Sequence, residues 1–493
     1  MNTFWELVEE AARDRAGDVV LADDYGRSLT AAQLRVEAEN VAAGLHERGV
    51  GAGDVVSWQI PSTLEAAVLM VACARLGVVQ NPIIPILRER EVGLIAQQVG
   101  TRLFVAPETW RGFGHCEMAR ALGLEVLALD LETPPDGGMR LSTGDTAKLP
   151  PPSNSTDCRW IYYSSGTTAD PKGARHTDAT VTASSNGVVD EMGMRSGDVY
   201  PIAWPFSHIG GVSMLSGALR TGATLLLFDT YDPTTTPDRM AAHRPTILGS
   251  ATPFFVAYIA AQRRHGDEPL FPALRACVGG GASTPLEVNR EVAEVLGVRG
   301  VAGAWGLTEF PVATSETPDD PEIGTSVGQP ARGVQVRVVD GELRLKGPQC
   351  FLGYVDASLD EAAFDEDGWF RTGDLGSVDD TGRVRIEGRL KDVIIRNAEN
   401  ISALEIEEAL LRHPSIADVA VIGVPDPRTG ERVCAVIVPT PGHDVTLAGL
   451  AEHCSSAGLA RYKCPEQLHV VDVLPRNPMG KILKNELRAA VTG

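Results

Sequence analysis

The sequence predicts an α/β protein built mainly from doubly wound parallel sheets. Short apolar runs alternate with segments of helical periodicity from residue 4 to residue 304, and strands separated by helices are typical of parallel sheets with helices on both faces. The chain has 493 residues, of which 43% are hydrophobic. This is more than one ordinary domain, so we expect a large domain followed by at least one smaller one.

In the first part of the chain, helical spacing covers residues 4–14 and 31–48, and Thr30 is expected to cap the second of these helices. The longest apolar stretch, residues 66–87, is interrupted by charged and polar residues. It therefore predicts a buried helix and strand and not a membrane span. Residues 132–157 are rich in Pro, Gly, Ser and Thr and predict a surface connection. Strands are expected at 18–22, 54–60, 102–106 and 124–128.

A second alternation follows, with strands expected at 199–203, 224–228, 246–249, 275–279 and 301–304. Strand-like pieces separated by glycines then predict a small antiparallel unit, at 334–339, 342–346 and 382–387. The last hundred residues predict a compact α+β domain, because strands at 417–424, 432–438 and 467–473 surround a helix near 446–458. A helix is expected to open within Asn400–Glu405, with Ser402 and Glu405 forming a capping box.

Composition and charge limit the function. A net charge of -21 argues against nucleic acid or an anionic membrane as a partner, since both require a basic face. The eight cysteines contain no C-x-x-C pair, which favours reduced thiols over disulfides or zinc. The N-terminus has neither a basic nor an apolar leader segment, so the sequence predicts a cytoplasmic protein. Only seven lysines occur, and four of them lie in the motifs described below.

In the run from Tyr162 to Gly173, four Ser and Thr hydroxyl groups, Gly166 and Lys172 follow directly after a strand-like segment. Hydroxyls and backbone N–H groups can surround phosphate oxygens, and a lysine adds a compact positive charge. Such a composition is equally typical of a polar turn between two strands. A Walker A loop is excluded, because no Gly-Lys-Ser/Thr follows at the required spacing. The candidate phosphate ligands are Ser164, Ser165, Gly166, Thr167, Thr168 and Lys172.

This run resembles the phosphate loop of the adenylate-forming superfamily, which includes acyl-CoA synthetases, peptide-synthetase adenylation domains and luciferases. Further matches follow in the family's order at Trp305–Glu309, Trp369–Asp374, Gly388–Asp392 and Pro475–Lys484, so the resemblance covers essentially the whole chain. It implies a large N-terminal domain (1–388) of doubly wound sheets with a small β-barrel-like unit. A hinge (389–392) and a mobile C-terminal α+β domain (393–493) would follow.

The resemblance also assigns roles in ATP binding beyond the phosphate loop. Glu309 would hold Mg²⁺ between phosphate oxygens, and the Asp374 carboxylate would accept both ribose hydroxyls. From the residues alone, Thr308 and Glu309 could equally begin an acidic surface loop, and Asp374 could belong to a type I turn. The other implied ATP contacts are Trp305 and Gly306 at adenine, Thr308 at the α-phosphate and Arg389 near the ribose.

For the acid and for CoA, the resemblance points to other positions. His208 lies where acyl-CoA synthetases place a residue that gates the acyl site, although a lone histidine is more often structural. Amino-acid-activating relatives have an aspartate near here, and none is present, which favours an acid without an α-amino group. Lys481 is implied as the catalytic lysine, with Glu309 and His208. The acyl pocket would include Gly279, Gly280 and Gly281. The hinge would include Lys391, and the CoA tunnel would include Ala398 and Asn400.

The resemblance therefore implies an ATP-dependent acid–CoA ligase that uses Mg²⁺ and acts on a medium-chain, alicyclic or aromatic acid. An enzyme that loads a carrier protein instead of CoA is the alternative. A nucleotide-binding protein without catalysis is disfavoured, because Glu309 and Lys481 are both present. A homodimer is one option for the oligomeric state. Four residues depart from the family pattern, namely Ala169, Trp305, Ala398 and Ala403, and a methyl group at 398 could narrow the CoA tunnel.

Overall fold

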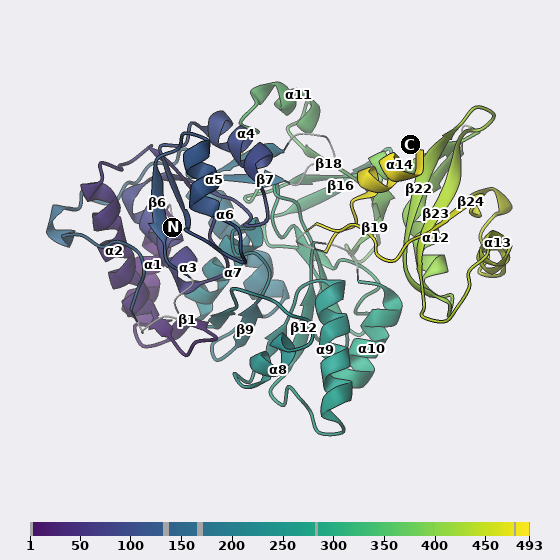
Figure 1. Cartoon of the computed structure of the whole chain (residues 1–493), viewed down its shortest axis with the longest axis horizontal. Coiled ribbons are helices and arrows are strands. Elements are labelled where there is room, and N and C mark those ends of the chain that lie inside the picture. Colours follow the sequence, from purple (N-terminus) through teal and green to yellow (C-terminus); the bar gives the residue numbers. More distant parts are fainter. Residues whose placement is uncertain are drawn as a thin grey trace.

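The computed structural model describes residues 3–131, 138–164, 171–281, 284–397, 399–477 and 480–492. The chain forms a large N-terminal part that carries most of the helices and a smaller C-terminal part at the opposite end of the molecule (Figure 1). This arrangement of sheets and helices confirms the predicted α/β class. The precise division at 388 and 393 stays a prediction.

The first sheet of the large part has six strands in the order β6-β5-β3-β4-β7-β8. Its strands are parallel except for β8, which returns antiparallel to β7. This hairpin brackets the predicted phosphate loop. The strands are β3 (Val55–Trp58), β4 (Val79–Pro82), β5 (Leu103–Pro107), β6 (Val126–Leu129), β7 (Trp160–Ser164) and β8 (Lys172–His176), and the associated helices are α3 (Leu64–Leu76), α4 (Glu89–Val99) and α5 (His115–Ala121).

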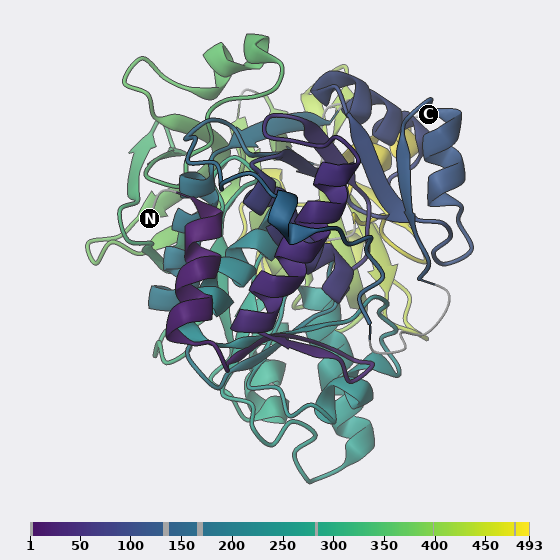
Figure 2. The same cartoon turned by 90° about the vertical axis from the view of Figure 1, so that its left-hand side faces the viewer.

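The second sheet, in the order β2-β1-β10-β9, joins segments far apart in the sequence, because Leu21 lies opposite Leu225 in a parallel pair. The two predicted alternations are thus interleaved. Two of its helices, α1 and α2, cover the end of the molecule away from the C-terminal part (Figure 2). The elements are β1 (Val19–Asp23), β2 (Ser28–Thr30), β9 (Val199–Ile202), β10 (Thr224–Leu227), α1 (Phe4–Asp14), α2 (Ala31–Glu47), α6 (Asp178–Ala183) and α7 (Ile209–Thr221), with a π-helical turn at Gly187–Glu191.

The third sheet begins with three parallel strands and continues with two antiparallel ones, in the order β11-β12-β13-β14-β15. One apolar core extends from Phe4 to Ala302 and joins these layers. The elements are β11 (Ile247–Leu248), β12 (Ala276–Gly279), β13 (Val301–Trp305), β14 (Thr314–Ser315), β15 (Gln329–Pro330), α8 (Thr236–Ala241), α9 (Thr252–His265) and α10 (Leu286–Leu296).

The predicted antiparallel unit is a four-stranded sheet in the order β16-β17-β18-β19. A separate core connects it to the third sheet, since Trp305 and Phe310 pack together with Phe351 and Phe370. This packing brings the end of β13 next to the strand that carries Asp374. The elements are β16 (Gln335–Val339), β17 (Glu342–Lys346), β18 (Phe370–Val378), β19 (Val384–Arg389) and α11 (Asp360–Ala363).

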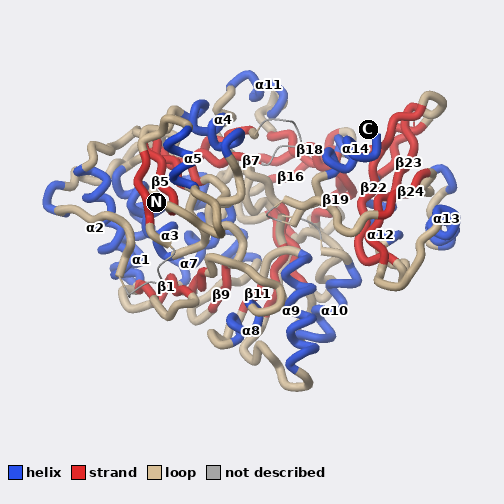
Figure 3. Tube along the Cα trace, in the orientation of Figure 1, coloured by secondary structure: helices blue, strands red, loops and turns tan. Residues whose placement is uncertain are grey.

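The C-terminal part is a β-sheet with helices on both faces. Alternate residues of its long hairpin enter two cores, one with Leu450 of α13 and the other with Leu487 of α14, as the two-residue period of a strand requires. Figure 3 shows these strands side by side between α13 and α14. The elements are β20 (Val393–Arg396), β21 (Glu399–Ser402), β22 (Ile416–Asp426), β23 (Gly430–Pro439), β24 (Gln467–Val470), α12 (Ala403–Leu410), α13 (Leu447–Ser456) and α14 (Lys484–Thr492).

The structure corrects one local prediction. The helix expected to open within Asn400–Glu405 begins at Ala403, and the residues before it, 399–402, form a strand that pairs with β20 and buries Ile401. Ser402 still caps the helix by accepting a bond from the Glu405 backbone N–H at 3.4 Å. The Glu405 carboxylate, however, binds the Lys463 ammonium instead of completing a capping box. Tertiary pairing therefore overrides the local motif.

Other local predictions are confirmed. The helix expected at 4–14 is α1, and Thr30 caps α2 in a full capping box with Gln33. The expected strands fall within a few residues of their observed positions. In the described part of the chain, no helix combines the length and apolar character needed to cross a membrane.

Candidate functional site

A cavity of about 1370 Å³ lies between the two parts of the molecule. Its N-terminal wall comes from the ends of β12, β13, β18 and β19, and its C-terminal wall from α12 and the segment before α14. That segment, drawn in yellow in Figure 1, runs from the small part toward the large one. It makes close contact there, because a Cβ placed on Gly480 (φ +80°) would lie 3.3 Å from Pro253. The predicted site residues that line this cavity are Gly279, Gly281, Trp305, Gly306, Asp374, Arg389, Lys391 and Lys481.

Asp374 is fixed at the centre of the N-terminal wall. It lies on β18 opposite Arg389 of β19, and the Arg389 Nε atom is 2.9 Å from Asp374 Oδ1. The indole N–H of Trp305 donates to the second carboxylate oxygen, Oδ2, at 2.8 Å. Asp374 is 2% exposed, so these partners hold an otherwise costly buried carboxylate in one orientation. This is the geometry of a preformed acceptor for hydroxyl groups.

Lys481 enters the same cavity from the C-terminal wall. Its backbone N–H donates to Asn477 Oδ1 at 2.9 Å, which holds the turn that presents the side chain. Burial, followed by repulsion from Arg389 and Lys391, lowers the pKa of Lys481 to about 7. Desolvation and Arg389 also lower the pKa of Lys391 to about 8, although Lys391 stays exposed at the cavity edge. Three cationic side chains thus converge on a space that would accept an anion.

Glu309 lies in the loop after β13 and is 8% exposed. Its Oε1 atom accepts a hydrogen bond from the Tyr354 hydroxyl at 2.7 Å. The Lys172 ammonium lies 5.7 Å from the centre of the Tyr354 ring, and Lys172 pairs with Ser164 across the β7–β8 hairpin. Lys172, one of the predicted phosphate ligands, therefore lies near Glu309. The loop residues Ser165, Gly166, Thr167, Thr168 and Ala169, and likewise Ala398, lie outside the described residues.

His208 and Thr308 line a second, much smaller pocket of about 10 Å³ beside apolar residues, and they do not line the large cavity. His208 caps α7, and its Nδ1 atom accepts from the Gly210 N–H at 3.1 Å. Burial lowers the pKa of His208 to about 4, so its ring is neutral at physiological pH. The Thr308 carbonyl accepts from His176 Nε2 at 2.9 Å. Asn400 is exposed on β21.

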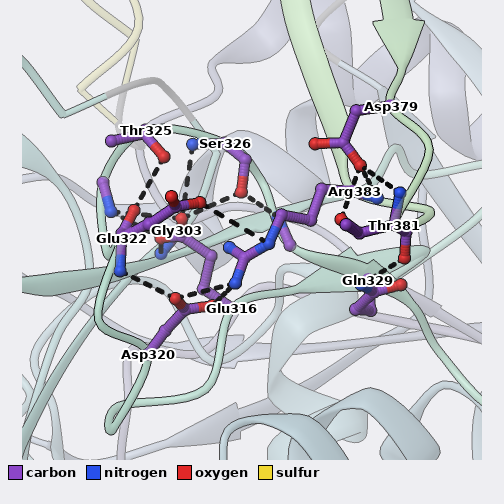
Figure 4. Close-up of polar contacts among 12 residues, drawn as sticks. Gly303, Glu316, Asp320, Glu322, Thr325, Ser326, Gln329, Asp379, Thr381 and Arg383 are labelled. Carbon is purple, nitrogen blue, oxygen red and sulfur yellow. Dashed lines mark hydrogen bonds and ion pairs between the residues drawn. The ribbon is translucent and has the colours of Figure 1, made fainter.

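A polar network behind the cavity wall was not found from the sequence. Glu316 is 1% exposed, and its carboxylate accepts bonds from the backbone of Gly303 and Gly324 and from the Ser326 hydroxyl, at 2.9 to 3.1 Å (Figure 4). Burial raises the pKa of Glu316 despite these donors. Gly303, Gly324 and Ser326 line the cavity, so Glu316 holds two parts of its wall together. No sequence spacing marks this residue, and only its acidity directly after the buried strand β14 distinguishes it.

The same network ties this wall to the antiparallel sheet. Arg383, next to the start of β19, forms an ion pair with Asp320 at 2.7 Å, and the Gln329 amide donates to the Thr381 carbonyl at 2.9 Å (Figure 4). This wall of the cavity is therefore braced from behind by two sheets.

The described residues contain no group of three His, Cys, Asp or Glu side chains that could hold a metal ion. Mg²⁺ does not need such a cluster, because it is usually bound by one or two carboxylates together with substrate phosphates and water. Glu309 fits this role, since one of its oxygens is fixed by Tyr354 and it lies on the side of the phosphate-loop hairpin.

Comparison with known proteins agrees with this geometry. The AMP-binding enzyme family matches residues 8–355, and the AMP-binding enzyme C-terminal domain matches residues 405–481. The chain therefore belongs to the family of AMP-binding enzymes. This confirms the resemblance to the adenylate-forming superfamily and its acid–CoA ligase branch.

Similarity to individual relatives extends over the whole chain. A medium-chain fatty-acid–CoA ligase of Escherichia coli (strain K12) is 29% identical over 513 residues, which cover 98% of this chain and 89% of the relative. A salicylyl-CoA synthase / salicylate adenylyltransferase of a Streptomyces species is 31% identical, and the match covers 97% of this chain and 92% of the relative. The crystal structure of ATP-bound MatB from Rhodopseudomonas palustris superposes with a TM-score of 0.87, at 29% identity and 99% coverage of both chains.

Proposed function

We propose that this enzyme is an ATP-dependent acid–CoA ligase. It converts a carboxylic acid without an α-amino group into an acyl-adenylate and then into an acyl-CoA thioester, with release of pyrophosphate and AMP. One observation carries this proposal. The cavity between the two parts brings Lys481, from the C-terminal part, next to Asp374, Arg389 and Trp305 of the N-terminal part. A nucleotide-binding wall and an opposed lysine are what adenylate formation requires.

In the first step, a carboxylate oxygen of the acid attacks the α-phosphorus of ATP, and the bond to the β-phosphate oxygen breaks. Trp305 and Gly306 would contact adenine, and Asp374 with Arg389 would hold the ribose. Negative charge develops on the phosphate and acyl oxygens, and Lys481 and Lys172 would stabilise it. The phosphate-loop residues Ser164, Ser165, Gly166, Thr167 and Thr168 would bind the leaving pyrophosphate.

Glu309 would hold Mg²⁺, whose charge neutralises phosphate oxygens when it is bound. The protein's own contribution is to hold the Glu309 carboxylate in position. Tyr354 fixes one Glu309 oxygen and leaves the other for the cation, and the bond from His176 fixes the backbone at Thr308.

In the second step, the CoA thiol attacks the acyl carbonyl, a carbon–sulfur bond forms and AMP leaves. Lys481 must then withdraw to open this face of the adenylate. We place the hinge at Lys391, within residues 389–392, between domains 1–388 and 393–493, so that rotation would exchange Lys481 for the region of Ala398 and Asn400. Gly280, together with its neighbours at 279 and 281, would border the acyl group.

The acid is proposed to be medium-chain, alicyclic or aromatic. Relatives named for a medium-chain fatty acid and for salicylate support this range, and neutral His208 beside apolar side chains suits an uncharged acyl group. Transfer to a carrier protein is less supported, because most of the similar proteins are named CoA ligases. We also propose a cytoplasmic location, in keeping with eight free cysteines.

The test is to incubate the protein with ATP, Mg²⁺, CoA and a panel of fatty, alicyclic and aromatic acids, and to measure acyl-adenylate and acyl-CoA separately by mass spectrometry. Thioester formed with one class of acid, and lost in Lys172→Ala or without ATP, is the expected result. Adenylate without thioester would reject the CoA-ligase proposal and favour the carrier-protein alternative. Neither product with any acid would reject both.

A further inference from the structure

We propose that Trp305 is a positioning residue that fixes the Asp374 carboxylate and so makes the enzyme distinguish ribonucleotides from deoxyribonucleotides. The proposal rests on the proposed function, since it assumes that ATP occupies the large cavity. It adds a role for Trp305, which stands where the family pattern has a tyrosine.

The hydrogen bond between these residues is short and buried. Trp305 Nε1 lies 2.8 Å from Asp374 Oδ2, and the two residues are 8% and 2% exposed. A bond from a neutral N–H to a carboxylate is stronger than one between neutral groups, and low local polarity strengthens it further. Without it, the carboxylate plane would be held only by the ion pair from Arg389 to the other oxygen.

Trp305 can fix its partner because it is itself held on several sides. Its backbone carbonyl accepts from the Ala313 N–H at 2.8 Å, and it pairs with Thr314 across β13 and β14. Its side chain belongs to the core that joins the third sheet to the antiparallel sheet, with Phe310 and Phe370. The direction of its single N–H is thus set by two sheets. The hydrogen bond from this N–H in turn fixes the orientation of the Asp374 carboxylate.

This arrangement leaves a defined set of acceptor positions. Each carboxylate oxygen can accept two hydrogen bonds. Trp305 occupies one position on Oδ2, whereas Oδ1 is buried without a hydrogen-bond partner among the described residues and Arg389 forms only an ion pair with it. Both oxygens therefore keep room for a hydroxyl group, which matches the two neighbouring hydroxyls of ribose. A deoxy sugar would leave one buried acceptor unpaired, and this is the kind of loss that gives strong discrimination.

The indole also has only one polar hydrogen. Because that hydrogen is used by Asp374, the adenine base can meet only carbon atoms of Trp305. The residue therefore selects the sugar through Asp374 and contributes to base binding only by apolar contact. These two contributions can be separated by experiment.

The experiment measures the affinity of the full-length protein for ATP, 2′-deoxyATP and 3′-deoxyATP by calorimetry in the presence of Mg²⁺. Wild type should prefer ATP over either deoxynucleotide by about tenfold or more, the loss expected for one unpaired buried acceptor. Trp305→Phe keeps an aromatic ring but removes the N–H. It should weaken ATP binding by about tenfold and deoxynucleotide binding by less, so that the preference falls severalfold.

Trp160→Phe is the matched control. Trp160 makes the same type of bond, from Nε1 to Asp178 Oδ1 at 2.7 Å, and is fully buried outside the cavity lining. Its loss should leave the ratio of ATP to deoxynucleotide affinity unchanged. In a double-mutant cycle, Trp305→Phe should no longer alter this ratio once Asp374→Asn is present, because the two changes act on one interaction.

Several outcomes would overturn the proposal. Equal weakening of all three nucleotides by Trp305→Phe would mean that the side chain gives apolar contact only. If this variant fails to fold, Trp305→Tyr takes its place, because its hydroxyl adds bulk at the ring tip but lies away from the position of the indole N–H. A wild-type preference for ATP in that variant would count against the proposal. Wild type that binds ATP and deoxynucleotides equally would reject the inference alone, whereas wild type that binds no ATP would reject the proposed function.

Discussion

Asp374 and Glu309 on the N-terminal side of the site each accept a hydrogen bond from a buried aromatic residue, whereas Lys481 on the C-terminal side has no ion pair within the described ranges. The carboxylates are fixed before a nucleotide arrives. The backbone N–H of Lys481 donates a hydrogen bond to Asn477, and burial and neighbouring cations lower the pKa of its side chain to about 7. The charged groups on the N-terminal side are thus held by hydrogen bonds, whereas the charged group on the C-terminal side is not held by an ion pair to any described residue.

Two basic residues close to Lys481 in the sequence do form ion pairs, so the missing ion pair is particular to Lys481. Lys484 forms an ion pair with Glu407 of α12 at 2.7 Å, and Arg488 forms one with Asp392 at 3.0 Å, so α14 is anchored to α12 and to the predicted hinge segment. The comparison teaches that the groups proposed to recognise the nucleotide are preorganised, whereas the lysine proposed to withdraw has no ion pair among the described residues. An unpaired ammonium has no bond to break when it moves.

The largest expected effect comes from removing the unpaired charge. Lys481→Ala should reduce acid-dependent exchange of pyrophosphate into ATP by about 100-fold to 1000-fold, as the loss of a preorganised stabilising group does elsewhere. The affinity for ATP, measured by calorimetry, should change little, because the fixed N-terminal wall holds the nucleoside. A comparable loss of ATP affinity would show that the lysine also belongs to the binding wall.

The next effect concerns the fixed side. Glu316→Gln replaces an acceptor of several hydrogen bonds by a side chain that is partly a donor, so it should lower the free energy of unfolding by about 2–3 kcal/mol. Urea denaturation measures this change. Glu322→Gln is the control, since the Glu322 side chain is 63% exposed and 4.0 Å from Arg383. That control should stay within about 0.5 kcal/mol of wild type, and equal effects would contradict the bracing role.

The low pKa of Lys481 predicts a dependence of stability on pH. Its pKa is about 7 in the folded protein and 10.5 in the unfolded chain, so between these values the unfolded state binds more protons and stability rises with pH. Lys481→Met should remove up to about 1.4 kcal/mol of this rise per pH unit. Denaturation at pH 7, 8 and 9 tests it. Lys148→Met is the control, because Glu47 raises the pKa of Lys148 and this lysine stays protonated over that range. Parallel curves for wild type and Lys481→Met would refute the prediction.

The smallest effect is expected at Tyr354. Tyr354→Phe removes the hydrogen bond to Glu309 and should weaken Mg²⁺-dependent ATP binding by about fivefold to tenfold, the equivalent of one such bond. Calorimetry with and without Mg²⁺ measures it. Tyr25→Phe loses a similar bond, to Asp229, on a residue that is 51% exposed, and it should leave ATP binding unchanged. An effect that is the same without Mg²⁺ would show that Tyr354 does not act through Glu309.

The sequence by itself determined the elements and the identity of most candidate site residues. Periodicity gave α1 and most strands, because apolar faces and caps are local features, and motif order pointed to Asp374 and Lys481. Pairing of β1 with β10, the strand at 399–402 and the buried Glu316 were not predicted, since each depends on contacts between segments far apart in the chain. Only the tertiary structure could decide that Trp305 contacts Asp374 and that Lys481 lines a cavity with no ion pair to any other described residue. Direction and burial of a side chain follow from packing, and no local pattern encodes packing.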